Sequence, residues 1–186
     1  MTTDAAPWVP IPAATLVAAP WRNGLGISHD IIRRPGWTVS IADLERDAPF
    51  SDYPGMDRIF TPIAGDPPPE LAFRGGPFEP CPLLVPKPFP GDIPTLSRIP
   101  APGRAFNVIT ERGKANATVT VLHLAAGDTV PTPDGACVLW HCLTGSLVIA
   151  GHTLAQGDSI LGFGASQPGP KATQAGIAIK VAISTS

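Results

Sequence analysis

The sequence predicts an all-β protein with little helix, built from two jelly-roll barrels in tandem that are fused into one globular unit. Three observations lead to this fold class. The chain of 186 residues contains 24 prolines and 19 glycines with no short repeat period, which is typical of many turns and short strands rather than long helices. Several stretches alternate apolar and polar residues as half-buried strands do. A segment of the first half also recurs in the second half, which indicates a duplicated unit.

The repeat aligns residues 37–65 with residues 117–145 without a gap, at an offset of 80 residues. The identical pairs are Thr38/Thr118, Val39/Val119, Leu44/Leu124, Gly55/Gly135 and Gly65/Gly145. Both halves then reach a Gly-Asp pair, where the offset falls to 66 residues, so the first half carries about 14 extra residues. We therefore predict an N-terminal unit over residues 1–104, with a Pro-rich insertion near residues 66–90, and a C-terminal unit over residues 105–186.

The strand candidates follow in chain order. TVSIADL at residues 38–44 and TVTVLHL at residues 118–124 alternate and are rich in β-branched residues. Further candidates are CVLWHCL, GSLVIAG and IAIKVAIS, which glycine-containing turns separate. The spacing Leu143-x-Gly145-x-Leu147, followed by a later Gly-Asp turn, is a hairpin rhythm typical of cupin-type jelly-roll barrels. Helical signal is confined to DIPTLSRI, residues 92–99, which could form one turn.

Composition excludes several classes of protein. Hydrophobic residues make up 44% of the chain and charged residues 15%, which indicates a globular protein. A net charge of −2 gives no basic surface for nucleic acid. The sequence shows neither a signal-peptide pattern nor an apolar run of about 20 residues, so we expect a cytoplasmic protein without membrane association. The three cysteines, Cys81, Cys137 and Cys142, form no C-x-x-C motif and are expected to be reduced.

The sequence predicts no metal site. Many cupin barrels hold a metal through an H-x-H pair, a glutamate, and a glycine that follows the glutamate by seven residues. Counting back seven residues from Gly65 reaches Arg58, and counting back from Gly145 reaches Val138. Neither residues 51–54 nor residues 131–134, where the H-x-H pair would fall, contain a histidine. A P-loop and a dinucleotide fingerprint are also absent, so we expect no cofactor.

Arg58 places a permanent cation where a metal-binding barrel would have a carboxylate, in the wall of the barrel mouth. A guanidinium presents a planar fork that matches a carboxylate, which makes Arg58 the candidate anion clamp. The alternative is an ion pair on the rim with Asp57 or Asp43.

Small, partly polar side chains share one face of the neighbouring strand. Thr38, Ser40 and Ala42 lie on this face, opposite Trp37, Val39 and Ile41. A barrel interior filled only by core would have larger apolar groups, so these residues leave room and donors for a ligand. The alternative is that this face points toward solvent.

The stretch WRNGLG, residues 21–26, combines an aromatic ring, a fixed charge and an amide ahead of two glycines. Asn23 and Gly24 suit a left-handed turn. Arg22 and Asn23 would also suit a polar ligand.

The blocks WRNGLGISHDI, WTVSIADLERDAPFSDYPGMDRIF, FPGD and AFNVITERG resemble the HutD/Ves family, in order and across nearly the whole chain. The resemblance implies a bicupin fold and a link to histidine utilisation in bacteria. It also implies binding of a small carboxylate of the formyl-glutamate, urocanate or formate class, with no established catalytic activity. Carried over by position, the implied ligand-binding residues are Trp21, Arg22, Asn23, Ser28, Ser40, Phe50, Arg58, Phe106 and Asn107. The sequence departs from the family pattern at Leu25, Asp30, Ala105 and Glu111, which puts the shared ligand in question more than the fold.

Three functions are compatible with the sequence, of which we favour the first. It is the non-catalytic binding of a small carboxylate in a cupin pocket, which regulates histidine degradation and needs no catalytic residue. The second is a metal-independent enzyme, an isomerase or hydrolase acting on a small organic acid, with Asp30 or Asp57 as the general base. The third is a structural or partner-binding protein that uses residues 67–90 as a contact surface. A homodimer is a further expectation, because exposed sheet edges can pair.

Overall fold

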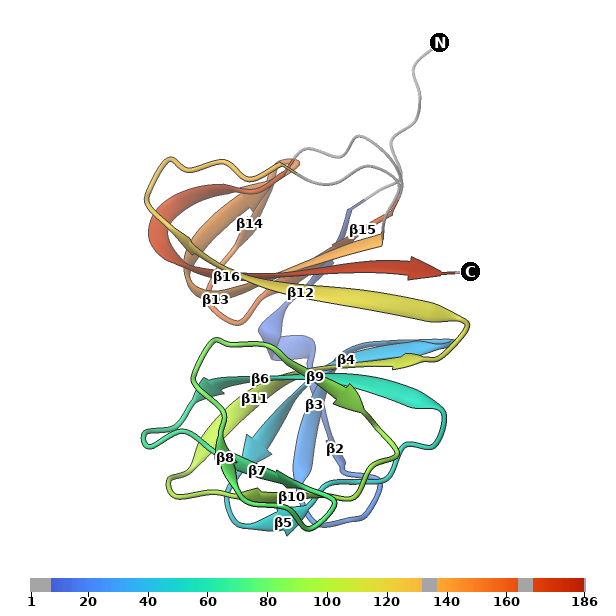
Figure 1. The fold of residues 1–186 in the computed structure, drawn as a ribbon. Coiled ribbons are helices and arrows are strands. Elements are labelled where there is room, and N and C mark those ends of the chain that lie inside the picture. The colour runs from blue at the N-terminus through green and yellow to red at the C-terminus, as the bar shows by residue number, and fades with distance from the viewer. Residues whose placement is uncertain (1–7, 132–136, 164–168, 186) are drawn as a thin grey trace. The chain divides into compact units, whose positions relative to one another are not determined.

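The computed structural model describes residues 8–131, 137–163 and 169–185, and its fold is all-β, which confirms the predicted class. The chain groups into two compact units (Figure 1). Val17–Asn116 form the N-terminal unit, and the described residues of Met1–Leu16 and Ala117–Thr185 form the C-terminal unit. Helical structure in the described ranges is limited to one 3-10 turn, η1 (Ala13–Thr15). Within those ranges, no helix has the length and apolar character needed to cross a membrane.

The boundary between the units differs from the predicted one. The predicted boundary, between residues 104 and 105, lies inside β11 (Gly103–Glu111), which pairs with β4 (Trp37–Leu44) on one side and β6 (Met56–Ala64) on the other. Since β11 is hydrogen-bonded on both sides, it is a central strand of the N-terminal unit. At the other end of the chain, β1 (Val9–Ile11) pairs with β15 (Ser159–Gly162), which assigns the first described residues to the C-terminal unit.

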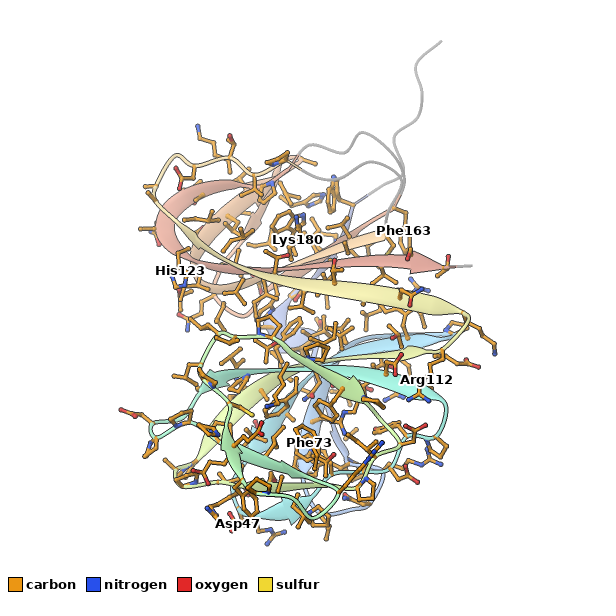
Figure 2. All side chains as sticks on the ribbon, viewed as in Figure 1. Asp47, Phe73, Arg112, His123, Phe163 and Lys180 are labelled. Carbon is orange, nitrogen blue, oxygen red and sulfur yellow. The ribbon has the colours of Figure 1, made fainter. Side chains whose placement is uncertain are left out.

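The N-terminal unit contains a six-stranded and a four-stranded antiparallel sheet (Figure 1). The order in the larger sheet is β2 (Val17–Pro20), β3 (Ile27–Arg34), β4, β11, β6 and β9 (Lys87–Pro90). The order in the smaller sheet is β5 (Ala48–Pro49), β10 (Thr95–Arg98), β7 (Glu70–Phe73) and β8 (Glu79–Pro80). Apolar side chains from both sheets, including Leu44, Phe60 and Leu71, form one core. Phe73, labelled in Figure 2, packs against this core.

The helical turn predicted within residues 92–99 is wrong, because this segment contains β10. Thr95 and Ser97 are buried whereas Leu96 and Arg98 are exposed, which is the two-residue period of a strand. β10 pairs with β5 on one side and β7 on the other. The two ladders provide hydrogen-bond partners for the backbone N–H and C=O groups of β10 on both sides, whereas a single helical turn would leave most of these groups unpaired.

The C-terminal unit contains one six-stranded sheet. Its order is β1, β15, β13 (Cys137–Ile149), β16 (Lys171–Thr185) and β12 (Ala115–Leu124), with β14 (His152–Leu154) paired to β13. Trp8, Trp140 and Ile160 belong to its apolar core. The Trp8 ring covers Gly162, where a Cβ atom would lie only 2.5 Å from the ring.

The repeat found in the sequence recurs as a local structure in both units. Gly65 and Gly145 both have a positive φ, 117° and 81°, and each follows a carbonyl that closely approaches a glycine on the partner strand. A Cβ atom on Gly103 would collide with the carbonyl oxygen of Ala64, and one on Gly176 would collide with that of Thr144. The register also shifts at both places, so each unit has the same glycine-dependent bulge. Of the other identities of the repeat, Gly135 lies outside the described residues.

Candidate functional site

A cavity of about 540 Å³ lies within the N-terminal unit. Its wall comes from β2, β3, β4, β6 and β11 of the larger sheet and from the two turns at residues 21–22 and 50–53. The lining residues are Ala19, Pro20, Trp21, Arg22, Ser28, Asp30, Arg33, Arg34, Gly36, Trp37, Thr38, Ser40, Ala42, Leu44, Phe50, Ser51, Tyr53, Met56, Arg58, Phe60, Asn107 and Ile109. A cavity of this size accommodates a small organic molecule.

The alternation of β4 builds one side of the cavity. Thr38, Ser40 and Ala42 all line it, whereas Val39 and Ile41 are buried on the opposite face of the strand. The small face of this strand therefore borders a cavity rather than bulk solvent, the alternative that the sequence left open.

Antiparallel register brings the polar residues of three more strands to the same place. Asn107 on β11 is paired with Ser40 on β4. Ile109, two residues further along the same face of β11, is paired with Arg58 on β6. Ser28 on β3 is paired with Ala42. A serine, an asparagine and an arginine from three different strands thus converge with Ser40 on one cavity.

Arg58 is the only charged residue of the described chain that is both buried and part of this cavity wall. It is 8% exposed. Its Nη1 donates to the carbonyl oxygen of Ser51 at 3.5 Å, and its Nη2 donates to Oδ1 of Asn107 at 3.4 Å. Both hydrogen bonds are long, and Nε has no acceptor among the described residues. The donors of Arg58 are therefore poorly satisfied by the protein.

Aromatic rings surround the same guanidinium. Its central carbon lies 4.6 Å from the centre of the Phe50 ring, 5.5 Å from that of Tyr53 and 5.6 Å from that of Phe89. Ring faces attract a cation more strongly where water is excluded. These rings hold the charge in position without neutralising it.

Arg58 takes part in none of the ion pairs found within residues 8–131, 137–163 and 169–185. The two carboxylates that could have paired with it are engaged elsewhere, since Asp57 binds Arg112 at 2.7 Å and Asp43 binds Arg104 at 3.1 Å. Burial lowers the pKa of Arg58 to about 10, and Tyr53 opposes that shift to a smaller extent. The cavity thus contains a cation whose counterion the described chain does not supply.

Three further arginines line the cavity. Arg22 lies over the Tyr53 ring, 5.8 Å from its centre. Arg33 donates two hydrogen bonds to Oδ2 of Asp30, at 2.8 and 3.2 Å. With Arg34 and Arg58, the lining holds four arginines and one aspartate. This excess of positive charge favours anions over cations.

Seven of the nine residues implied by the resemblance line this cavity: Trp21, Arg22, Ser28, Ser40, Phe50, Arg58 and Asn107. Asn23 and Phe106 do not. Asn23 joins the two turns instead, because its Nδ2 donates to the carbonyl oxygen of Pro49 at 2.9 Å and its Oδ1 accepts from the amide of Leu25 at 3.1 Å. Phe106 is fully buried and lies next to Asn107 on β11, so it points to the opposite face.

Tyr53 and Ser51 were not predicted from the sequence. Tyr53 contributes a ring to both Arg22 and Arg58, and Ser51 contributes the carbonyl that accepts from Arg58. The signal was present, because both residues lie between Phe50 and Arg58 in the turn that leads into β6. Arg33 and Arg34 were also missed, although they end the strand that contains Ser28.

The histidines and cysteines form no second centre in the described ranges. His29 binds Asp43 at 2.9 Å, and His141 is hydrogen-bonded to Ser159 at 2.9 Å. No group of three His, Cys, Asp or Glu side chains among the described residues could hold a metal ion. Burial raises the pKa of the Cys81 thiol and raises that of Cys142 to about 11, so neither is a reactive thiolate at neutral pH.

Comparison with known proteins identifies the family. A family model described as HutD matches residues 13–179. A stretch of 54 residues is 41% identical to the "uncharacterized 21.2 kDa protein in hutC 3'region" of Pseudomonas putida, and it spans 25% of this chain and 28% of that protein's length.

Solved structures show the same fold. The conserved protein of unknown function PA5104 from Pseudomonas aeruginosa PAO1 has a TM-score of 0.83 and 21% identity, with 96% of this chain and 99% of that chain covered. HutD from Pseudomonas fluorescens SBW25, in a formate condition, has a TM-score of 0.82 and 24% identity over 97% and 100% of the two chains. A cupin 2 conserved barrel domain protein from Leptotrichia buccalis has a TM-score of 0.61 and 12% identity over 100% and 99%. At these identities the likeness establishes a cupin-like fold and nothing about the ligand.

Proposed function

Since the chain belongs to the HutD family, we propose that it binds a small carboxylate in the cavity of its N-terminal unit, without catalysing a reaction, and thereby regulates histidine degradation. The observation that supports this most is Arg58, a guanidinium that is 8% exposed, lines the cavity, and pairs with no carboxylate among the described residues. An isolated buried charge is costly to keep. A carboxylate ligand would supply the missing counterion through charge-assisted hydrogen bonds.

The lining supports a carboxylate ligand. Serine and asparagine side chains beside Arg58 can bind carboxylate or carbonyl oxygens, and aromatic rings can contact a planar or aliphatic remainder. Formate, urocanate and formyl-glutamate all fit a cavity of about 540 Å³. The relative named for its place beside hutC, and the related HutD structure described for a formate condition, support this choice and the link to histidine utilisation.

A second candidate is a metal-independent isomerase or hydrolase that acts on a small organic acid. It is favoured by one observation: Asp30 is the carboxylate of the described cavity lining and is 25% exposed. Oδ2 of Asp30 already accepts two hydrogen bonds from Arg33, which leaves this oxygen less available to a substrate proton and argues against a general-base role. The other base that the sequence offered, Asp57, binds Arg112 and does not line the cavity.

The test is a thermal-shift and calorimetric screen against formate, urocanate and formyl-glutamate, with formamide and the methyl ester of urocanate as controls that lack a carboxylate. A ligand that binds the folded state raises its melting temperature, and we expect this for carboxylates only. Arg58→Met removes the charge and keeps most of the volume, so it should abolish the shift. No shift in the wild type with any of the three acids contradicts the proposal. Turnover of a bound acid that Asp30→Asn abolishes would favour the enzyme instead.

A further inference from the structure

Arg112 joins three segments of the N-terminal unit without lining its cavity. It lies in the turn between β11 and β12 and is labelled in Figure 2. Its guanidinium donates to Asp57 at 2.7 Å, to both carboxylate oxygens of Asp92 at 2.7 and 2.9 Å, and to the carbonyl oxygen of Met56 at 2.9 Å. Its backbone amide also donates to the carbonyl oxygen of Gly55 at 3.0 Å.

Besides its own turn, Arg112 contacts the N-terminal end of β6 with the turn before it, and the turn after β9. These two turns are in close contact. The amide of Tyr53 donates to the carbonyl oxygen of Gly91 at 2.9 Å, and the amide of Gly91 donates to that of Met56 at 2.8 Å. A Cβ atom on Gly91 would lie 3.0 Å from Cβ of Tyr53, so the backbone of one turn packs directly on the other.

The turn held in this way carries a ring of the cavity wall. Tyr53 lines the cavity and faces two of its arginines, with ring centres 5.5 Å from Arg58 and 5.8 Å from Arg22. Without the guanidinium, Asp57 and Asp92 would face each other unpaired, and like charges at short range repel. The N-terminal end of β6 and the turn after β9 would then move apart, and Tyr53 with them.

We propose that Arg112 is a positioning residue of the carboxylate site: it fixes the turn that carries Tyr53, and so sets the fit of the cavity around Arg58. This inference rests on the proposed function. Exposed ion pairs usually add little to global stability, so the main effect of Arg112 is on local geometry. A displacement of a site residue by about 1 Å is enough to weaken a preorganised site.

The experiment measures backbone amide exchange and formate affinity by NMR in the wild type, Arg112→Gln, Tyr53→Ala and the double variant. In Arg112→Gln we expect faster exchange at the amides of Tyr53 and Gly91 and an affinity for formate that is about threefold to tenfold lower. In the Tyr53→Ala background, Arg112→Gln should have no further effect on affinity, because a double-mutant cycle isolates what the two residues do together. Gly91→Ala should weaken binding in the same way, since the added Cβ displaces Tyr53 directly.

Arg98→Gln is the matched control, because Arg98 is also exposed and binds one carboxylate, Glu70 at 2.8 Å, but neither residue lines the cavity. Unchanged exchange at Tyr53 and Gly91 in Arg112→Gln overturns the inference. An equal loss of affinity with and without the Tyr53 ring also overturns it, because the effect would then be general. A wild type that binds no formate, with protected amides at Tyr53 and Gly91, contradicts the proposed function itself and removes the basis of this inference.

Discussion

The guanidinium of Arg58 lies against the ring of Phe50, with 4.6 Å between the guanidinium carbon and the ring centre. The contact holds a positive charge inside the N-terminal unit while leaving that charge without a counterion in the described chain. Such a buried charge costs stability, and an anionic ligand would offset that cost.

Replacing the buried cation should increase stability and abolish carboxylate binding together. We expect Arg58→Met to raise the free energy of unfolding by about 1–3 kcal/mol, because it removes a desolvated charge and keeps an apolar side chain against the rings. Chemical denaturation measures this change, and calorimetry with formate measures the loss of binding. Arg98→Met, at an exposed arginine, should change stability by less than about 1 kcal/mol. A large loss of stability in Arg58→Met would show that the charge is compensated.

The affinity for a carboxylate should fall at high pH. Burial lowers the pKa of Arg58 to about 10, so the folded protein loses this proton at a lower pH than the unfolded chain does. Arg58 is therefore fully protonated at neutral pH. The affinity for an anion should decline as the pH approaches and passes about 10, because the guanidinium loses its charge there. Because the pKa is lower in the folded state, the destabilising effect of the buried charge is complete at neutral pH. It shrinks as the pH rises above about 10.

Calorimetric titrations across this pH range check the decline, and Tyr53→Phe is the background that removes the neighbouring phenol. Arg58→Lys should shift the decline to lower pH, because a buried lysine loses its proton more readily than arginine does. Affinity that is constant through pH 10 in the wild type would assign anion binding to the other arginines of the lining.

Filling the cavity from β4 should block binding without unfolding the protein. Ser40 lines the cavity, so the side chain introduced by Ser40→Leu occupies space that a ligand would use. We expect an affinity loss of at least about tenfold, with a stability change of less than about 1.5 kcal/mol, because the added atoms enter a void and not packed core. The control is Thr118→Leu, at an exposed position on β12. Wild-type affinity in Ser40→Leu would mean that the ligand binds elsewhere.

Asn23 and Asn107, the two asparagines implied as ligand-binding residues, should behave differently when replaced. Asn107 lines the cavity and accepts a hydrogen bond from Arg58. Asn23 does not line the cavity, and its side chain instead joins two turns. Asn107→Ala should lower the affinity for formate about tenfold. Asn23→Ala should lower the free energy of unfolding by about 1 kcal/mol and leave the affinity within about threefold of wild type. A reversal of these effects would place Asn23 in the site.

The duplicated bulge should be equally sensitive in both units. Alanine at Gly103 or at Gly176 places a Cβ atom against a carbonyl oxygen, of Ala64 in one case and Thr144 in the other. We expect each change to lower the free energy of unfolding by about 2–4 kcal/mol. Denaturation followed by near-UV signals measures both variants. A clear difference between them would argue that the two bulges are not equivalent.

The sequence predicted what depends on local period and on the repeat. The small face of β4 follows from two-residue alternation, and the position of Arg58 follows from counting back from Gly65. Asn23 and Phe106 are different, because a family motif marks a position along the chain and not the direction of a side chain. Phe106 adjoins Asn107 on β11 but points to the other face of the sheet.

Long-range pairing explains what the sequence did not reveal. Arg112 contacts Asp57, 55 residues away, and Asp92, 20 residues away, and no local pattern links these positions. The boundary between the units was misplaced for the same reason. Strand β11 is followed closely by β12, yet its hydrogen bonds are with β4 and β6.

The pairing of β1 with β15 also has a consequence for biosynthesis. Because a ribosome delivers the polypeptide from its N-terminus, all strands of Val17–Asn116 are available for folding while β15 and β16 are still untranslated. Gly162, which the indole of Trp8 covers in the folded chain, is synthesised only after that interval. The unit that contains the cavity is therefore synthesised in full before β15, whereas β1 can pair only after β15 has been made.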